Sequence, residues 1–349
     1  MSGEQAERML RWVRPRRWSI TFEAAFAALL ALLAWPVVAL DGESDEVELV
    51  IDYLEALRDG DVEKAQTYIK PGQAVDADDS WLNEESLSSR WEIESVRHRS
   101  ASNRYVHAVI ASGGESVESS FLVEESGDGL RIANPYMYLT VGPGPIQALN
   151  LNGSWHTPHR DEEDVPVQVA LFPGSYRLFE DVPGFPGGSA ASFLAMPQDR
   201  PVALASIVGE AFAGNGELET RLNNDLIAWI DSCVRSTEAQ PEGCPFSAVS
   251  EYGGVDDGVH EFKEAEDLAW AVDAYPRVRI DDGLELETLA TGWVSLSGEG
   301  DVMFEGTEER VRGRCRVGFG TTTVLMLPGG QFAFTAEEGL SNTCRRGLS

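Results

Sequence analysis

The feature that most constrains this chain is a long apolar segment close to its beginning. Residues 24–40 contain no charged side chain, and tryptophans stand within the wider segment 18–40 at Trp18 and Trp35. A transmembrane helix needs about 20 apolar residues to span a hydrocarbon core of roughly 30 Å, and tryptophan favours the membrane–water interface. The sequence therefore predicts a single transmembrane helix over residues 18–40.

The charges around this segment predict its orientation. Residues 1–17 carry five arginines, whereas acidic residues dominate after residue 40. The five are Arg8, Arg11, Arg14, Arg16 and Arg17. Because positive charge stays on the cytoplasmic side, we expect a cytoplasmic head of residues 1–17 and an extracytoplasmic body of residues 41–349, tethered to the cell membrane. Two alternatives stay open: a signal peptide cleaved after Ala39, and a buried helix of a soluble protein.

Length and charge narrow the class of protein. At about 100–200 residues per domain, 349 residues predict roughly two domains plus smaller parts. The formal net charge of −31 makes nucleic acid an unexpected partner, because phosphate binding needs clustered Lys and Arg. Acidic clusters, such as the one around Asp78 and Asp79, predict a solvated surface that repels anionic polymers.

All four cysteines follow the apolar segment. They are Cys233, Cys244, Cys315 and Cys344, and they allow three disulfide pairings. We expect Cys233 to pair with Cys244 across a Pro/Gly-bearing loop, and Cys315 to pair with Cys344, because an exported compartment permits disulfides. A thiolate metal site is disfavoured, since no C-x2-C spacing is present.

Residues 41–135 predict an α+β domain. Val47, Val50, Leu54 and Leu57 recur at helical spacing, and Gly60 predicts the end of that helix. A second short helix follows Asp61, and four strands are expected between residues 91 and 134, with glycines at the hairpin turns. We also expect a short helix to begin near Trp81.

The helical part of this segment resembles the opening of the nuclear transport factor 2-like superfamily, especially its small envelope and lipoprotein members. The residues that carry this resemblance are Tyr53, Leu54, Ala56, Leu57, Gly60, Asp61 and Ala65. It covers residues 44–134 and implies a cone-shaped domain in which a curved sheet wraps around helices. Many such domains are scaffolds of unknown function, and some are enzymes. The whole layout resembles membrane-anchored extracytoplasmic proteins of Gram-positive bacteria.

The rest of the chain predicts two further parts. Residues 136–181 are strand-rich, and they resemble small β modules of exported Gram-positive proteins through Asn152, Gly153, Pro173, Gly174 and Tyr176. Residues 182–349 begin with a Pro/Gly-rich stretch, continue with one helical region that buries Leu222, Leu226, Ile227, Trp229 and Ile230, and end in strands. They predict a second, disulfide-containing α+β domain with an antiparallel sheet.

Residues that carry chemistry are sparse, so we predict no catalytic, cofactor-binding or metal-binding residue. His156 and His159 stand three apart, but Pro158 prevents a regular helix, and a solvated loop is favoured over a metal site. His98 and His107 are expected to face solvent or a cross-strand neighbour. The sequence has no G-x-S-x-G, G-x-x-x-x-G-K-[ST] or H-E-x-x-H motif.

These features together predict a non-catalytic, membrane-anchored interaction or scaffold protein of the bacterial envelope, with a protein, peptide or glycan partner. The alternative is a small-ligand-binding or enzymatic domain that uses the interior of residues 44–134. The acid/base candidates for that alternative are Asp52, Tyr53, Tyr68 and Tyr105. A sensing role, in which the cytoplasmic head passes a signal inward, is also open.

Overall fold

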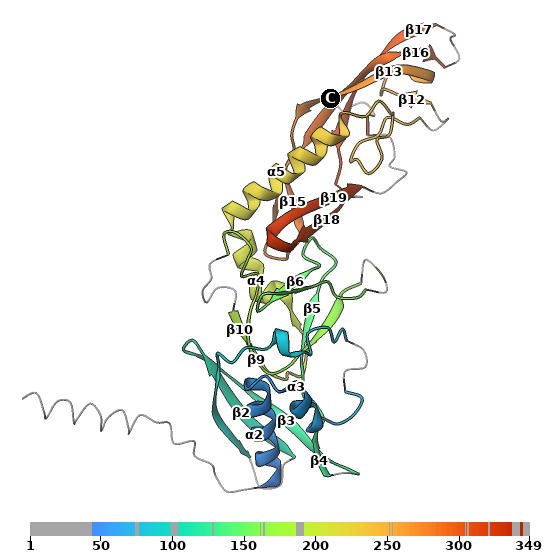
Figure 1. Ribbon diagram of the computed structural model, residues 1–349. Coiled ribbons are helices and arrows are strands. Elements are labelled where there is room, and N and C mark those ends of the chain that lie inside the picture. The colour runs from blue at the N-terminus through green and yellow to red at the C-terminus, as the bar shows by residue number, and fades with distance from the viewer. Residues whose placement is uncertain are drawn as a thin grey trace, which may run out of the picture. The chain divides into compact units, whose positions relative to one another are not determined.

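The computed structural model is a mixed α+β fold with mostly antiparallel sheets and few helices (Figure 1). It describes residues 44–349, with the exception of residues 74–76, 99–103, 128, 161, 163–164, 186–191, 251, 253, 304, 306, 320–321, 337–342 and 345–349. The predicted head of residues 1–17 and the predicted span of residues 18–40 lie outside the described part. Within that part, no helix has both the length and the apolar character that crossing a bilayer requires.

Helix α2 (Asp45–Arg58) forms as its sequence predicts. The Ser44 side chain caps its first turn by accepting a hydrogen bond from the Val47 backbone N–H. Its end is a Schellman motif, in which Gly60 takes φ +81°, donates to Leu57 O, and lets Asp61 N reach Ala56 O at 2.8 Å. A residue with a Cβ would be strained at this left-handed position, so the glycine fixes where the helix stops.

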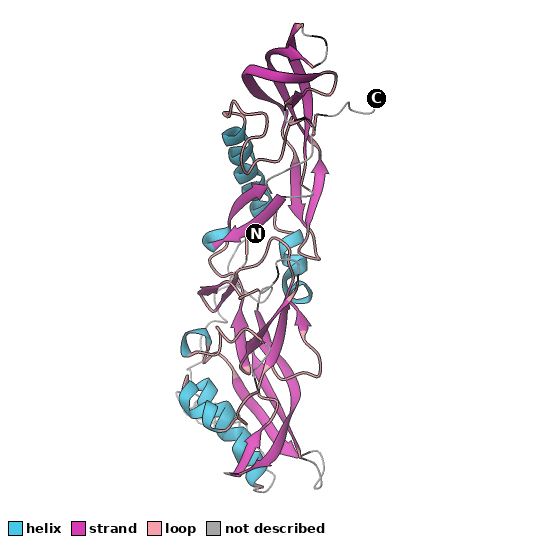
Figure 2. Ribbon diagram, turned by 90° about the vertical axis from the view of Figure 1, so that its right-hand side faces the viewer, coloured by secondary structure: helices cyan, strands magenta, loops and turns pink. Residues whose placement is uncertain are grey.

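A four-stranded antiparallel sheet follows, and α2 and α3 lie on one side of it (Figure 2). Asp61 caps α3 by accepting from Lys64 N at 2.9 Å. The remaining elements of this region are α3 (Val62–Thr67), β1 (Glu92–His98), β2 (Tyr105–Ser112), β3 (Glu115–Ser126) and β4 (Gly129–Ile132). The strand order β1-β2-β3-β4 is a meander, which confirms the two helices and four strands expected from the sequence.

The apolar face of α2 packs on this sheet in one hydrophobic cluster. From the helix come Val50, Tyr53 and Leu54, all fully buried, and from the sheet come Ile110 and Phe121. Tyr53 meets Phe121 edge to face, with ring centroids 6.0 Å apart. Burial of this many apolar side chains stabilises the region without any disulfide, because all four cysteines lie elsewhere.

The middle of the chain is a set of short strands. A three-stranded sheet has the order β11-β5-β8, in which β11 pairs parallel to β5, and β6–β7 and β9–β10 form two separate antiparallel pairs. Their bounds are β5 (Met137–Val141), β6 (Leu149–Leu151), β7 (Ser154–His156), β8 (Val167–Leu171), β9 (Gly174–Arg177), β10 (Ser192–Ala195) and β11 (Val202–Ala203). Asn152 and Gly153 join β6 to β7 with φ +52° and +90°, the geometry of a two-residue hairpin turn.

The last part consists of helices and longer strands. Its helices are α4 (Leu204–Ala213) and α5 (Gly216–Cys233), and the 3-10 turn η3 (Pro328–Gly330) joins the last two strands. Its strands are β12 (Val255–Asp256), β13 (Glu261–Ala274), β14 (Arg277–Ile280), β15 (Leu286–Ala290), β16 (Gly292–Val302), β17 (Glu308–Val317), β18 (Thr322–Leu327) and β19 (Gln331–Ala336). The main sheet has the order β12-β13-β16-β17, with every neighbour antiparallel, and β14–β15 and β18–β19 form separate pairs.

Four sequence expectations need correction. Trp81 does not begin a helix; it is fully buried, and the helical turn is a 3-10 segment, η1 (Glu84–Ser86), which Asn83 caps. The Pro/Gly-rich stretch contains strand β10, because Phe193 packs on Tyr176 with stacked rings. The single expected helical region is two helices, since Gly214 ends α4 and Asn215 caps α5. Ile227 and Trp229 are only partly buried.

The predicted segment boundaries at 135/136 and 181/182 have no counterpart in the hydrophobic core. The larger hydrophobic cluster contains Trp81, residues of the middle strands and residues as far along the chain as Cys344. The smaller cluster contains Phe172 and Met196 in addition to residues of the first region. The middle strands therefore share their apolar side chains with the parts on both sides of them in the sequence.

Candidate functional site

The two disulfides lie in the last part of the chain and have the pairing that the sequence favours. Cys233, the last residue of α5, is bonded to Cys244, and Cys315 on β17 is bonded to Cys344 near the C-terminus. No cysteine is left free. Both disulfide bridges are buried, so they are part of the protein core and are not exposed at the surface.

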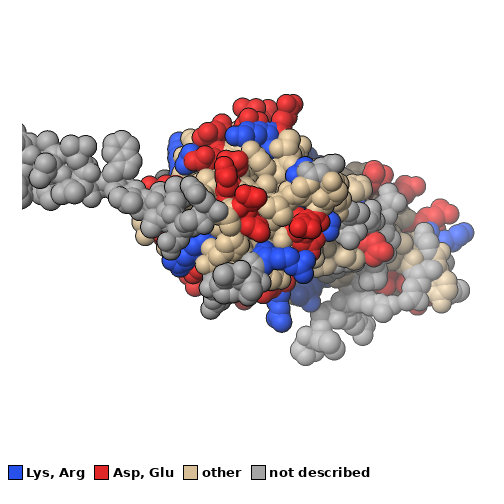
Figure 3. All heavy atoms as spheres, turned by 90° about the horizontal axis from the view of Figure 1, so that it is seen from below, with Lys and Arg blue, Asp and Glu red and all other residues tan. Residues whose placement is uncertain are grey.

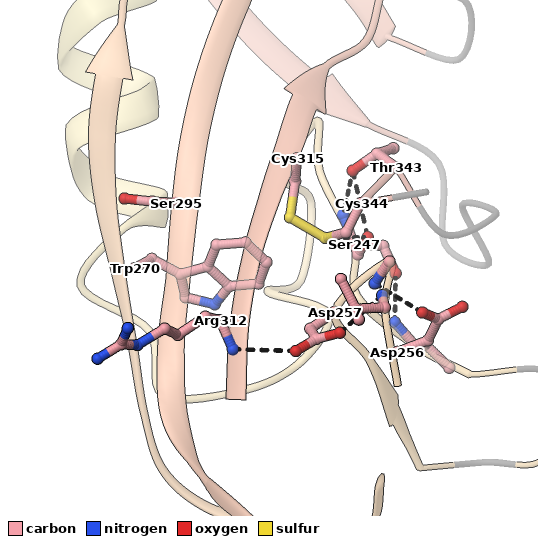
Figure 4. The surroundings of a disulfide bond; sticks show 12 residues. Ser247, Asp256, Asp257, Trp270, Ser295, Arg312, Cys315, Thr343 and Cys344 are labelled. Carbon is pink, nitrogen blue, oxygen red and sulfur yellow. Dashed lines mark hydrogen bonds between the residues drawn. A yellow bond between two sulfur atoms is a disulfide. The ribbon is translucent and has the colours of Figure 1, made fainter. Parts of the chain in front are cut away.

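The Cys315–Cys344 bridge holds a segment against the outer edge of β17 (Figure 4). Thr343 donates its backbone N–H to Ser247 O at 2.8 Å, and Thr343 O accepts from Arg316 N at 3.0 Å. The main-chain groups at this end of the edge strand are therefore paired, and an edge whose groups are paired does not invite another strand.

Asp257 closes the same edge further along. This buried carboxylate accepts from Val259 N at 2.8 Å and His260 N at 2.9 Å through Oδ1, and from Arg312 N at 3.0 Å through Oδ2. Its backbone lies so near β17 that a Cβ at Gly313 would stand 2.8 Å from Asp257 O. The glycine permits this approach, because any larger residue would push the Asp257 loop away.

The face of β17 that points away from the Cys315–Cys344 bridge carries four arginines. We call them the arginine row: Arg310, Arg312, Arg314 and Arg316. They alternate along the strand, and alternate residues of a strand project from one face of its sheet. All four are exposed. Figure 4 shows the Arg312 side chain directed away from the Cys315–Cys344 bridge, while its backbone N–H is held by Asp257.

Only one member of the arginine row has an ion-pair partner among the described residues. Arg314 Nε lies 3.0 Å from Asp273 Oδ2, and its guanidinium stands 4.7 Å from the ring centre of Trp293. The acidic residue nearest in register to the row is Glu299, which is opposite Arg310 at one end. The row is a local positive surface on a chain of net charge −31. On the face seen from below in Figure 3, acidic and basic side chains are intermixed.

The acid/base candidates of residues 44–134 are used in packing or lie at the surface. The Tyr53 hydroxyl is buried and donates to Pro135 O at 2.8 Å. Burial, and after it the neighbouring Tyr136 and Tyr176, raises the pKa of Tyr53 well above its ordinary value, so it is a neutral donor. Tyr68 Oη stands 3.5 Å from Asp52 Oδ2, and Tyr105 is exposed. The structure does not bring these four groups to one pocket.

Three aromatic side chains decide whether the interior of this region is open, and all three are buried. Phe121 and Trp91 belong to the cluster beneath α2, whereas Trp81 belongs to the larger cluster and meets His156 edge to face at 5.2 Å. Phe121 and Trp91 thus occupy space beneath α2, whereas Trp81 packs in the larger cluster.

The histidines of β1 and β2 make local polar contacts. His98 Nε2 lies 2.7 Å from Ser44 Oγ at the start of α2. His107 Nδ1 lies 3.2 Å from Ser120 Oγ and 3.5 Å from Glu118 Oε1. Ser120 Oγ also lies 3.5 Å from His107 Nε2, so the hydroxyl stands beside the ring and is not directed at one nitrogen as in a nucleophilic triad. The cross-strand neighbour expected for His107 is confirmed, because Ser120 is its partner in register.

His156 and His159 are held by different partners. His156 Nε2 lies 3.0 Å from Ser154 Oγ, and the His159 backbone N–H donates to Asp78 Oδ2 at 2.7 Å. Burial works against the charged form of Asp78, but hydrogen bonds from His159 and Ser80 outweigh it and lower its pKa. In the described part of the chain, no three His, Cys, Asp or Glu residues are grouped so that they hold a metal ion.

Asp78 also joins the segment after α3 to strand β8. Its backbone N–H donates to Gln168 O at 2.8 Å, and its carbonyl accepts from Ala170 N at 2.9 Å. Nearby, the Arg160 guanidinium donates to Val165 O at 2.9 Å and Gly142 O at 2.5 Å. Asp78 and Arg160 line a cleft of about 1010 Å³, and their polar groups are engaged in holding its loops together.

A smaller apolar groove of about 200 Å³ lies between the β6–β7 hairpin and β18. Trp155, Met326 and Leu327 line it. The Trp155 indole N–H is bound to Asp181 Oδ2 at 2.8 Å, so that polar atom is engaged outside the groove. The groove offers mostly apolar contact, and the polar residues in its lining are Gln147, His156 and Thr157.

Comparison of the chain with protein-family models, curated proteins and solved structures finds no match. The resemblance of residues 44–134 to the nuclear transport factor 2-like superfamily stays a prediction. The fold and the surface define an α+β chain with a disulfide-closed sheet that presents arginines. The arginine row was not among the sequence predictions, although its alternation at every second position is visible in the sequence.

Proposed function

We propose that this chain is a non-catalytic interaction protein, anchored by residues 18–40 in the cell membrane, with residues 41–349 outside the cytoplasm of a bacterium. The observation that carries the proposal is the pair of buried disulfides, Cys233–Cys244 and Cys315–Cys344. Disulfides persist in oxidising compartments and are rare in the reducing cytosol. The arginines before residue 18 and the apolar run after it supply the matching topology.

The proposed interaction role rests on a comparison of polar side chains that are engaged in internal contacts with charged side chains that are exposed. In the sheet of residues 44–134, Tyr53, His98 and His107 are engaged in hydrogen bonds or packing, whereas Tyr105 is exposed. The exposed arginine row, in contrast, leaves most of its guanidinium groups free of ion pairs with the described residues. Exposed charged groups of one sign raise the local concentration of ligands of the opposite sign.

Paired fusions of the full chain test the proposal. A C-terminal reporter that is active only outside the cytoplasm should give signal, and one active only in the cytoplasm should stay silent. The matched control replaces the five head arginines with glutamines, which should weaken this orientation bias. A cytoplasmic C-terminus in the unaltered chain contradicts the proposal.

A further inference from the structure

The arginine row has a spacing that suits a linear ligand. Residues in a strand rise about 3.3 Å each, so alternate arginines stand roughly 6.7 Å apart and the row of four extends about 20 Å. Guanidinium groups bind phosphate oxygens in pairs through parallel N–H donors. A chain that carries one phosphate per repeat at a similar interval would meet successive arginines.

The sheet surface beside the arginine row carries small side chains. Ser297 is the register partner of Arg312, and Ser295 is that of Arg314. On the next strand, Ala269 pairs with Ser297 and Ala271 pairs with Ser295. Three of these four small residues are exposed, and Ser295 is partly so, so they leave room along the arginine side chains.

Protection of the sheet edge does not account for the row. Charged side chains on an edge strand do discourage pairing with another strand. Here, however, Asp257 and Thr343 already bind the main-chain N–H groups of Arg312 and Arg316. The guanidinium groups of Arg312 and Arg316 are exposed and make no ion pair with a described residue, so their charge is available to a ligand.

The negative net charge does not prevent anion binding at this place. The Debye length at 0.15 M salt is about 8 Å, so charges close to the row decide the local potential. Asp273 is bound to Arg314, and the other acidic residues that the register places on this face lie at the Arg310 end: Glu266, Glu299, Asp301 and Glu308. Positive charge is therefore least compensated from Arg312 to Arg316.

We propose that the arginine row binds a linear polyol phosphate polymer, in which phosphodiesters join short polyol units. Single-stranded nucleic acid has a similar phosphate spacing, but its binding relies on aromatic platforms for the bases. The one aromatic ring of this face in register with the row is Trp293, and Arg314 covers it at 4.7 Å. A ligand with phosphates and without bases fits these contacts best.

The test uses the full chain in a non-ionic detergent and fluorescently labelled poly(glycerol phosphate), with binding followed by anisotropy at several salt concentrations. In Arg312→Gln/Arg316→Gln, Kd should rise about tenfold, and the slope of log Kd against log salt should flatten by about 1.4, for two lost phosphate contacts. Arg312→Lys/Arg316→Lys keeps the charge but not the paired donors, so a rise of about threefold is expected.

The matched control is Arg277→Gln/Arg279→Gln. These two arginines also alternate on a strand and are exposed, but each faces a carboxylate, Glu219 at 3.5 Å and Glu287 at 2.6 Å. The change in net charge is identical, and the basic head is present in every variant, so the difference between variants isolates the arginine row. The control should bind within about twofold of the unaltered chain.

Three results would overturn the proposal. The first is no binding of poly(glycerol phosphate) by the unaltered chain. The second is an equal loss in the control and in Arg312→Gln/Arg316→Gln, or no loss in either. The third is binding of a single-stranded oligothymidine of equal length as tight as that of poly(glycerol phosphate). None of these results bears on membrane topology, so they are separate from a failure of the proposed function.

Discussion

Residues 44–134 and residues 204–344 both set helices against antiparallel strands, but they are stabilised differently. In the first region α2 buries one apolar face on the sheet, and no cysteine is present. In the second region the Cys315–Cys344 bridge and the Asp257 loop hold segments against the outer strand of the sheet, and the arginine row is exposed. The first sheet is thus stabilised by a packed helix, whereas the edge of the second sheet is closed by a disulfide and by hydrogen bonds.

The largest loss in the free energy of unfolding is expected from Phe121→Ala. Phe121 is fully buried between α2 and the sheet, and truncation of such a side chain costs about 3–5 kcal/mol. Hydrogen exchange should show the loss of protection mainly in β2 and β3, with β16 little changed. Tyr105→Phe, at an exposed position of the same sheet, is the control and should change stability little. Equal loss of protection in both regions would break the comparison.

The next effect is expected from Cys315→Ser/Cys344→Ser. This bridge closes a loop with a sequence separation of 29, for which chain entropy gives about 3.5 kcal/mol. Exchange should rise in β17 and in the segment around Ser247, while β1 to β4 keep their protection. Cys233→Ser/Cys244→Ser, with a separation of 11, should cost about 3 kcal/mol and act at the end of α5. Loss of protection in β1 to β4 would contradict this.

A smaller effect is expected from Asp257→Ala. The variant leaves three backbone N–H groups without their carboxylate acceptor, which costs about 2–3 kcal/mol in a buried place. Asp273→Ala on the outer face removes an exposed pair with Arg314 and should cost less than about 1 kcal/mol. Urea denaturation measures both. A larger loss for Asp273→Ala would show that the outer face, not the edge, fastens this sheet.

The smallest effect is the pH dependence of the Asp78 contacts. Since the folded state lowers the pKa of Asp78, its contribution is present above the unfolded value of about 3.9 and is lost as pH falls through the folded value. Asp78→Asn should therefore cost about 1 kcal/mol at pH 7 and nothing near pH 2. Urea denaturation at the two pH values checks this, and a cost that stays constant with pH would contradict it.

The sequence predicts the parts of this fold that local chemistry determines. The apolar spacing of α2, the Gly60 stop, the Asp61 cap, the hairpins and the two disulfides follow from residues close together in the chain or from few pairing choices. Strand β10 and the burial of Trp81 depend on partners far away in the sequence. No local pattern reveals such partners, so those two features were missed.

The arginine row also combines a feature that local sequence predicts with features that depend on distant residues. The alternation of Arg310, Arg312, Arg314 and Arg316 is a local signal, and it predicts one charged face of a strand. Asp257 and Thr343 close the free edge of the same strand, and the Asp257 contact joins residues 55 positions apart in the sequence. The row therefore becomes recognisable as a surface only in the folded chain.

The most direct test of an extracytoplasmic body is peptide mapping by mass spectrometry. The full chain is isolated from native membranes after free thiols have been blocked, and it is digested without reductant. We expect to recover Cys233 linked to Cys244 and Cys315 linked to Cys344, with no blocked cysteine. Recovery of all four cysteines as blocked thiols would contradict this expectation.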